Sequence, residues 1–299
     1  MLRRMFPPKL LSKMRISPVA PQSGRAGVAA VLMVRNEALN IEEWARFHLA
    51  AGIDHVICYD DGSTDETVAI LQDVLGDRLS LFPWQQRLYS GDTGQELHNQ
   101  LLGYGHALAN FGGRFRWMAC IDADEFLVPK QADSLSEALA HLEHCGQISL
   151  PWHNFGRNGH EKRPKQGTVQ SYTRRVADPM SGVRGVTNFK TIVDPCRVTA
   201  LKVHSYEVDG KAITWNDRGE EFAIKDRTGR DFYATDHIQL NHYYSRSEED
   251  VLAKIANGPI QTTAAERHTA RIRRAVDRIE AEEVEDRCAL DFLDRIKAG

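Results

Sequence analysis

Two acidic residues follow a short apolar run near the middle of the chain, in the sequence WMACIDADEFLV. Asp122 and Asp124 are separated by one residue, so both carboxylates can reach one hard cation. Ligands of open α/β sheets bind just beyond the carboxyl ends of the strands, which is where this pair falls. Mg²⁺ or Mn²⁺ prefers oxygen ligands and keeps positions for water and phosphate oxygens. A short acidic turn is the simpler interpretation of an isolated DxD motif, but the strand-end position favours a metal site that receives a diphosphate.

Polar residues also follow two other apolar runs. Asp60 and Asp61 begin the loop in YDDGSTDET, which is either a well-formed turn before a helix or a contact to a nucleotide base. Arg35, Asn36 and Glu37 follow the first apolar run, in VRNE. Because the carboxyl ends of parallel strands share one edge of a sheet, these residues are predicted to lie beside the acidic pair.

The apolar runs, and the helical periodicity between them, predict an α/β fold with a mostly parallel sheet flanked by helices. Strands and helices alternate up to about residue 152, which is typical of βαβ units. Asn40, with Glu43 three residues later, predicts a capping box at the start of the first helix. From about 153 to 245 the sequence is rich in Gly, Arg, His and Asn, which predicts long functional loops with short strands. Strands are predicted at 28–34, 55–60, 79–82, 117–122 and 147–152, and helices at 41–51, 66–75, 95–111, 135–144, 247–257 and 263–297.

The composition changes twice along the chain and predicts three parts. Residues 1–26 are basic and rich in proline, and we expect a flexible arm that could touch an anionic membrane surface. Residues 27–258 are predicted to form the α/β domain. Residues 259–299 are predicted to form a C-terminal helical extension, because an apolar stripe recurs at helical spacing.

Bulk composition argues against several classes of function. The 299 residues carry a net charge of −3, so no global field indicates a nucleic-acid partner. We find no run of about 18 apolar residues that predicts a transmembrane helix. Pro7 and Pro8 stand where a signal peptide has its apolar core. The five cysteines are scattered without a CxxC pair, which argues against a disulfide framework or a zinc site. We therefore expect a cytoplasmic protein, with the arm as its contact to the inner face of a membrane.

The three polar segments together resemble one superfamily of enzymes. The stretch VLMVRNEALNIEEWARFHLAAGIDHVICYDDGSTDET, followed by IDADEF, is similar to the glycosyltransferase family 2 superfamily, and most similar to its branch close to glycosyltransferase family 92. The resemblance extends over roughly residues 28–258. It implies a GT-A fold, a nucleotide-diphosphate sugar as donor, a divalent metal (Mn²⁺ or Mg²⁺) and inversion at the anomeric carbon. The implied activity is sugar transfer to the hydroxyl of a glycan or lipid-linked acceptor, in bacterial surface glycan or polysaccharide synthesis.

The resemblance also implies roles for individual residues. Asp60 resembles the acidic residue that binds the base, and Asp122 and Asp124 resemble the DxD pair beside ribose, diphosphate and metal. Enzymes with this fold often add a histidine to the metal, and the sequence leaves His204 and His242 as alternatives. The segments FKTIVDP…VH and NHYYSRSEEDVLAKIANG resemble later parts of the family and would bring to the site Lys190, His204, His242, Tyr243, Ser247 and Lys254.

Inverting transfer needs a general base that takes the proton of the acceptor hydroxyl. The stretch HNFGRNGHEKRP resembles the acceptor-side loop of the family, and its Glu161 is the first candidate. Asp178, His153 and Glu125 are the alternatives. We find no ED or QxxRW signature of typical family 2 enzymes downstream, so this assignment depends on the loop alone. Candidate phosphate ligands are Arg157, Arg163 and Lys190.

Other classes of function fit the sequence less well. A nucleotidyltransferase is expected to have a glycine-rich loop after the first strand, and VRNEALN lacks the glycines. A dinucleotide oxidoreductase is disfavoured because no GxGxxG follows that strand. A catalytically inactive nucleotide-sugar-binding or scaffold protein of the same fold is the alternative that we keep, although the acidic pair is intact.

Overall fold

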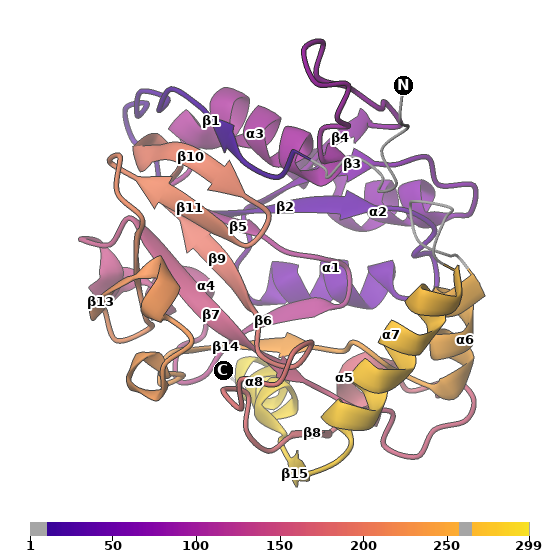
Figure 1. The fold of residues 1–299 in the computed structure, drawn as a ribbon. Coiled ribbons are helices and arrows are strands. Elements are labelled where there is room, and N and C mark those ends of the chain that lie inside the picture. Colours follow the sequence, from indigo (N-terminus) through magenta and orange to yellow (C-terminus); the bar gives the residue numbers. More distant parts are fainter. Residues whose placement is uncertain (1–10, 257–264, 299) are drawn as a thin grey trace.

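The computed structural model describes residues 11–256 and 265–298 (Figure 1). These residues fold around a sheet of ten strands with helices on both sides. Residues 1–10 of the predicted arm and residues 259–264 of the predicted extension lie outside the described residues. The predicted α/β fold is confirmed.

The first half of the chain supplies four parallel strands, namely β2 (Val28–Val34), β3 (His55–Asp60), β4 (Leu79–Pro83) and β5 (Trp117–Cys120). These match the strands predicted from the apolar runs. β2 lies between β3 and β5 and buries nearly all its side chains, as expected of a strand covered on both faces. The carboxyl ends of all four strands therefore meet at one edge, which is the edge that carries the polar segments.

The second half adds strands of both directions, namely β6 (Glu125–Pro129), β7 (Gln147–Asn154), β9 (Phe189–Val193), β12 (Ile213–Trp215), β13 (Glu221–Ala223) and β14 (Ile238–His242). β9 lies antiparallel between β5 and β7, which gives the order β13-β12-β7-β9-β5-β2-β3-β4. β14 pairs in parallel with β7 and antiparallel with β6. The parallel part of the sheet is thus continued by a mixed part. β7 is the strand predicted at 147–152 and β6 was not predicted, whereas β9, β12, β13 and β14 come from the stretch that was predicted to be mainly loops.

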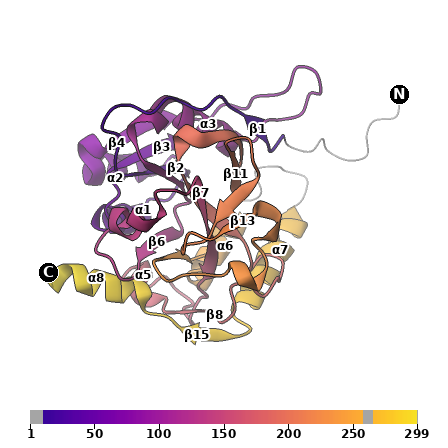
Figure 2. The same cartoon turned by 90° about the vertical axis from the view of Figure 1, so that its left-hand side faces the viewer.

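Three longer helices belong to the first half, namely α1 (Ile41–Ala50), α2 (Thr67–Leu75) and α3 (Asn99–Phe111). α1 and α3 lie on opposite sides of β2 (Figures 1 and 2). α1 buries Trp44 and His48 against the core, as the periodicity of the sequence predicts, and it also buries Phe47, which was not predicted to lie on that face. Gly103 lets α3 approach Tyr59 so closely that an added Cβ atom would lie 3.2 Å from the ring.

The capping box predicted at the start of α1 is not formed. Asn40 makes no side-chain hydrogen bond to the helix, and its amide donates instead to Glu37 Oε2 (3.3 Å). Glu43 accepts hydrogen bonds from the backbone N–H groups of Thr168 (2.6 Å) and Val169 (2.9 Å), at the start of the short helix α5 (Thr168–Ser171). The carboxylate therefore satisfies orphan N–H groups of a distant helix rather than those of its own.

Residues 11–26 were predicted to belong to the flexible arm, but they lie against the fold. β1 (Met14–Arg15) pairs with β10 (Val198–Lys202), which in turn pairs with β11 (Ser205–Val208). The side chain of Met14 packs over α3 at Gly105, where a Cβ atom would lie only 2.6 Å from the methionine methyl group. Because β10 would otherwise be an exposed sheet edge, pairing with β1 satisfies backbone groups that composition alone does not reveal.

The C-terminal part consists of two helices separated by a short strand. It is preceded by α6 (Glu248–Ala256) and comprises α7 (Ala265–Ile279), β15 (Glu283–Glu285) and α8 (Cys288–Ala298). α7 packs on α6 through Val251, Ile272 and Val276, and Phe292 of α8 joins the main core. β15 pairs with β8 (Arg174–Val176), and the remaining short helix is α4 (Leu135–Ala138). None of the helices in residues 11–256 and 265–298 has the length and apolar character needed to cross a bilayer.

Candidate active site

Asp124 and His242 face each other at the carboxyl edge of the sheet. Asp124 lies in the turn between β5 and β6, and His242 ends β14, which pairs with β6 so that His242 lies opposite Glu125. The backbone N–H of Tyr243 donates to the carbonyl of Asp124 (2.8 Å) and fixes the turn against the strand. Asp124 Oδ1 lies 3.7 Å from His242 Nε2, which is too far for a direct hydrogen bond.

The tautomer of His242 follows from its other neighbours. Asn154 Nδ2 donates to the carbonyl of Val186 (2.7 Å), so Asn154 Oδ1 is the atom that faces His242 Nδ1, at 2.7 Å. Since an amide oxygen only accepts, Nδ1 carries the proton. Burial lowers the pKa of His242, although Asp124 acts in the opposite direction, and the ring is therefore neutral near pH 7. Its Nε2 lone pair points toward a carboxylate oxygen, an arrangement that a cation between the two atoms would stabilise.

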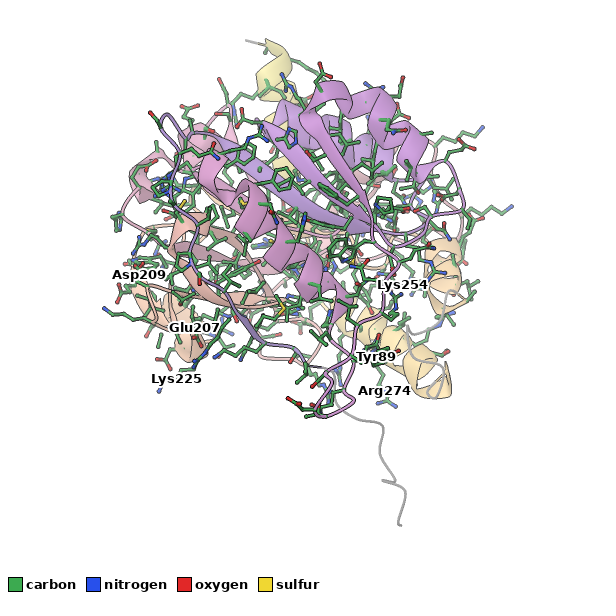
Figure 3. The ribbon with its side chains drawn as sticks, turned by 90° about the horizontal axis from the view of Figure 1, so that it is seen from above. Tyr89, Glu207, Asp209, Lys225, Lys254 and Arg274 are labelled. Atoms are coloured by element: carbon green, nitrogen blue, oxygen red, sulfur yellow. The ribbon has the colours of Figure 1, made fainter. Side chains whose placement is uncertain are left out.

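Two basic side chains complete the surroundings of Asp124. Lys254 of α6 places Nζ 3.3 Å from Asp124 Oδ2, donates to the carbonyl of Tyr244 (2.9 Å) and lies 4.0 Å above that ring (Figure 3). Arg246 is buried and donates to the carbonyl of Ala123 (3.1 Å). Burial alone would raise the pKa of Asp124, but Lys254 and His242 hold it well below its usual value. The carboxylate is therefore ionised at neutral pH.

Arg246 was not predicted from the sequence as a site residue. Its backbone has a φ of 49°, in the left-handed region that a non-glycine residue seldom adopts. This conformation turns the side chain back toward the DxD turn and toward Glu37, whose Oε2 lies 3.7 Å from Arg246 Nη1. Burial raises the pKa of Glu37, and Arg246 acts against that rise. The only signal in the sequence was a basic residue within the NHYYSRSEED segment.

Asp122 belongs to a second group of charges beside the first. Lys190 is 1% exposed and lies 2.8 Å from Asp122 Oδ2 and 3.2 Å from Glu125 Oε2. Gln100, at the start of α3, donates to Asp122 Oδ1 (2.8 Å). Glu125 is fully buried, and its Oε2 also accepts from the backbone N–H of Asp122 (2.8 Å). Glu125 therefore stabilises the turn and is not exposed to an acceptor substrate. Burial raises the pKa of Glu125, whereas the two carboxylates keep Lys190 protonated.

Trp44 of α1 fastens the same turn from the other side. Its indole Nε1–H donates to the carbonyls of Asp122 (3.1 Å) and Glu125 (2.9 Å). One buried donor thus satisfies both ends of the loop that carries the acidic pair. This role was not predicted, because the tryptophan was interpreted only as part of the apolar face of its helix.

The residues predicted to contact the nucleotide lie on the loops after β2 and β3. Asn36 Oδ1 accepts from the backbone N–H of Thr64 (2.8 Å) and so joins the two loops. Asp60 Oδ1 accepts from the N–H of Ser63 (2.9 Å). Asp61 is bound by both guanidinium nitrogens of Arg87 (2.9 and 3.1 Å), which leaves Asp60 as the better candidate for a ligand contact. Arg35 is exposed and has no hydrogen bond or ion pair within the residues that the structure describes.

Several predicted residues are not brought to Asp124. Glu161 is exposed on its loop, and within the described residues its one hydrogen bond runs from the N–H of Glu249 to its backbone carbonyl (3.1 Å). His204 Nδ1 donates to the carbonyl of Phe189 (3.1 Å), and its ring contacts Trp152 edge-on (5.8 Å between ring centroids). His242 lies against the same tryptophan, with the ring centroids 4.1 Å apart.

The other candidate bases and phosphate ligands have partners of their own. Asp178 pairs with Arg230, and His153 contacts the hydroxyl of Tyr233 (3.1 Å). Ion pairs also engage Arg157, with Glu248 and Glu280, and Arg163, with Asp250. These two arginines therefore hold the loop to the C-terminal helices and are not free to bind phosphate.

The chemistry of the donor set fits a cation that is shared with a ligand. Among the described residues, no group of three or more His, Cys, Asp or Glu side chains is placed to hold a metal. Asp124 Oδ1 and His242 Nε2 lie 3.7 Å apart, and the neutral imidazole donates its Nδ1–H to Asn154, as metal-binding histidines usually do to an outer partner. Mg²⁺ and Mn²⁺ sites with few protein ligands are completed by water and phosphate oxygens. The pair therefore suits a metal that arrives with a diphosphate.

Comparisons with known proteins agree with part of this description. The family model for glycosyltransferase family 92 matches residues 28–279. A glycosyltransferase family 92 protein from Oryza sativa subsp. japonica is 28% identical over 154 residues, which is 49% of this chain and 24% of the relative. One from Ricinus communis is 24% identical over 199 residues, or 62% of this chain and 33% of the relative. The alignments thus span about a quarter to a third of the length of these relatives.

Solved structures give a weaker similarity. Glucosyl-3-phosphoglycerate synthase from Mycobacterium tuberculosis, in complex with Mn²⁺, UDP and glucosyl-3-phosphoglycerate, is 18% identical, with 58% of each chain covered and a TM-score of 0.31. The assignment to a family therefore rests on the sequence match, which covers most of the described residues. The relationship to family 92 predicted from the sequence is confirmed, while the wider family 2 relationship stays a prediction. This chain belongs to glycosyltransferase family 92.

Proposed function

We propose that the protein is an inverting glycosyltransferase that moves a sugar from a nucleoside diphosphate to an acceptor hydroxyl with the help of a divalent metal. The observation that carries the proposal is the pair formed by Asp124 and the unprotonated Nε2 of His242, 3.7 Å apart. The two atoms are too far apart to form a hydrogen bond with each other, and a cation between them would bind both.

In this proposal Asp124 and His242 hold Mn²⁺ or Mg²⁺, and Asp122 lies beside the ribose and diphosphate. The metal would neutralise the charge that develops on the diphosphate leaving group. Lys254 and Arg246 add two fixed positive charges next to the same carboxylate. Because these groups are positioned before substrate binds, they can stabilise developing charge without reorganisation. His204 is not needed as a ligand.

The nucleotide is proposed to lie along the loops after β2 and β3. Asp60 has one carboxylate oxygen that makes no hydrogen bond or ion pair in the described part of the chain, and it suits an N–H group of a base. Arg35, Asn36 and Glu37 border the path from that base to Asp124, since Asn36 binds the second loop and Glu37 lies beside Arg246. Lys190 is proposed to act through Asp122, which it holds in place, rather than by direct contact with phosphate.

Glu161 stays our proposed general base, because its carboxylate is exposed and unpaired within the described residues and can meet a bound acceptor. A glycan or lipid-linked acceptor, a cytoplasmic location and contact of the N-terminal arm, predicted at residues 1–26, with a membrane are likewise proposals from the sequence. The relatives named above are plant proteins, so they do not support the bacterial setting.

The direct test is calorimetric titration with UDP, GDP, CDP and ADP, each with and without Mn²⁺. We expect one diphosphate to bind, and to bind much more tightly with metal. Equal affinity with and without Mn²⁺ would contradict the proposed role of Asp124 and His242. A folded protein that binds none of the four would favour the inactive scaffold instead.

A further inference from the structure

A polar pocket of about 530 Å³ lies near Asp122. Gln100 links the two, because it lines the pocket and donates to Asp122 Oδ1 (2.8 Å). The walls come from the start of α3, from the turn between β10 and β11, from the loop after β13 and from the N-terminal segment. The residues that matter here are Ser12, His98, Lys202, His204 and Arg227.

Arg227 is a cation without a carboxylate partner among the described residues. Its guanidinium lies over the ring of Phe189 (4.5 Å) and donates through Nη1 to the carbonyl of His204 (2.8 Å) and to Ser149 Oγ (3.2 Å). Both hydrogen bonds use Nη1, and the bond to His204 connects Arg227 to the turn after β10. The other N–H groups of the guanidinium make no hydrogen bond in the part of the chain that the structure describes, and the side chain lines the pocket.

The rest of the wall has the same character. Lys202 is exposed at the end of β10 and forms no ion pair within residues 11–256 and 265–298. His98 Nδ1 is buried without a hydrogen-bond partner, although the His98 backbone is fixed by the carbonyl of Leu11 (3.1 Å). Among the residues that the structure describes, no Asp or Glu lines the pocket. Two carboxylates act on His98, and each has a cation beside it: Asp122 pairs with Lys190 (2.8 Å) and Glu96 lies 3.9 Å from Arg87.

We propose that this pocket binds an acidic group of a substrate, a carboxylate or a phosphate carried by the transferred sugar or by the acceptor. The inference rests on the proposed function only in naming the ligand a substrate. A planar guanidinium with free N–H groups matches two oxygens of a carboxylate or phosphate. Lys202 adds a second charge, and His98 adds a polar ring atom that has no partner in the protein. A pocket for a neutral sugar alone needs neither unpaired cation.

The test is calorimetric titration of the full chain with glucuronate, glucose 6-phosphate and glucose. We expect the two acidic sugars to bind and glucose to bind at least tenfold more weakly. Lys202→Gln and Arg227→Gln each remove one charge and should weaken the acidic sugars about tenfold. Lys225→Gln is the matched control, because this lysine lies two residues from Arg227 but is exposed and does not line the pocket (Figure 3).

Three results would overturn the proposal. Glucose could bind as tightly as its acidic relatives, the two pocket variants could leave the affinities unchanged, or Lys225→Gln could weaken them equally. If Arg227→Gln melts much below the wild type because a bond to the turn is lost, the test depends on Lys202→Gln alone. The Lys202 side chain forms no ion pair within the described residues, so its replacement should leave the fold unchanged.

The source of the acidic group follows from the same variants. If Lys202→Gln weakens UDP-glucuronate but not UDP-glucose, both with Mn²⁺, the donor sugar carries the acid. If it weakens only the free acidic sugar added to the UDP-loaded protein, the acceptor carries it. A protein that binds acidic sugars but no nucleoside diphosphate would refute the proposed function and leave the pocket assignment intact.

Discussion

Asn154→Ala should weaken metal binding although Asn154 is not itself a proposed ligand. In the wild type, Asn154 Oδ1 holds the proton of His242 on Nδ1 through a 2.7 Å hydrogen bond, with the asparagine fixed in turn by Val186. Without that acceptor, the imidazole can carry its proton on Nε2 and donate it to Asp124, which is 3.7 Å away and needs only a small shift. A metal must then expel this proton before it binds.

The magnitude follows from the bond that the metal would have to break. A hydrogen bond to a charged group contributes about 1.5–3 kcal/mol, which corresponds to roughly a ten- to hundredfold loss in Mn²⁺ affinity. Loss of an outer-shell partner of a metal-bound histidine typically has an effect of the same size. We would measure free Mn²⁺ by electron paramagnetic resonance during titration of the protein in the presence of UDP.

The matched control is Asn241→Ala. Asn241 is also buried, and it bonds to Gln239 (2.8 Å) and Tyr243 (3.2 Å) but not to His242. Both variants lose buried hydrogen bonds and should melt at similar, lowered temperatures, whereas only Asn154→Ala should lose metal affinity. Equal Mn²⁺ affinity in the two variants would refute the assignment of the tautomer and, with it, the argument for a metal between Asp124 and His242.

Further predictions concern the turn, the base and the core. Asp124→Asn should abolish the Mn²⁺-dependent part of UDP binding while the melting temperature changes little, and calorimetry with unchanged metal dependence would remove Asp124 from the site. Trp44→Phe deletes the N–H that holds two carbonyls of the DxD turn, so UDP affinity should fall about tenfold as the turn loosens; an unaffected affinity would mean that the turn is rigid without it. Glu161→Gln should slow sugar transfer more than it weakens donor binding, and equal transfer rates would exclude Glu161 as the base. Burial lowers the pKa of His48 to about 4, so between that pH and about 6.5 the unfolded chain binds more protons and stability falls as pH falls. Between pH 7 and pH 5 the free energy of unfolding in urea should therefore fall by about 2 kcal/mol more in the wild type than in His48→Gln. An equal fall in the two proteins would show that His48 does not titrate as its burial implies.

The parts of the fold that depend on local pattern could be predicted from the sequence. The apolar run 28–34 is the buried strand β2, and the acidic pair does follow the end of β5. These predictions succeed because burial on both faces and chain direction are read from a few adjacent residues. They placed Asp124 at the carboxyl edge of the sheet without knowledge of its neighbours.

The parts that depend on pairing between distant segments could not be predicted. His242 faces Asp124 because β14, which it ends, pairs with both β6 and β7. The Glu43 carboxylate accepts hydrogen bonds from the start of α5, more than a hundred residues away, instead of capping its own helix. Arg246 enters the site through an unusual backbone conformation that its residue type disfavours. In each case the decisive contact lies outside any window of sequence in which a pattern can be recognised.

The position of β9 has a consequence for how such an enzyme would work over time. β9 carries Lys190 and is hydrogen-bonded to β5, so residues from the two halves of the chain are attached to one continuous sheet. A cleft between two domains can open by rotation about a hinge, but neighbouring strands of one sheet cannot separate without breaking their ladder. We therefore expect the turnover cycle to involve loop movements and not domain closure. Small-angle scattering should give the same radius of gyration with and without UDP and Mn²⁺.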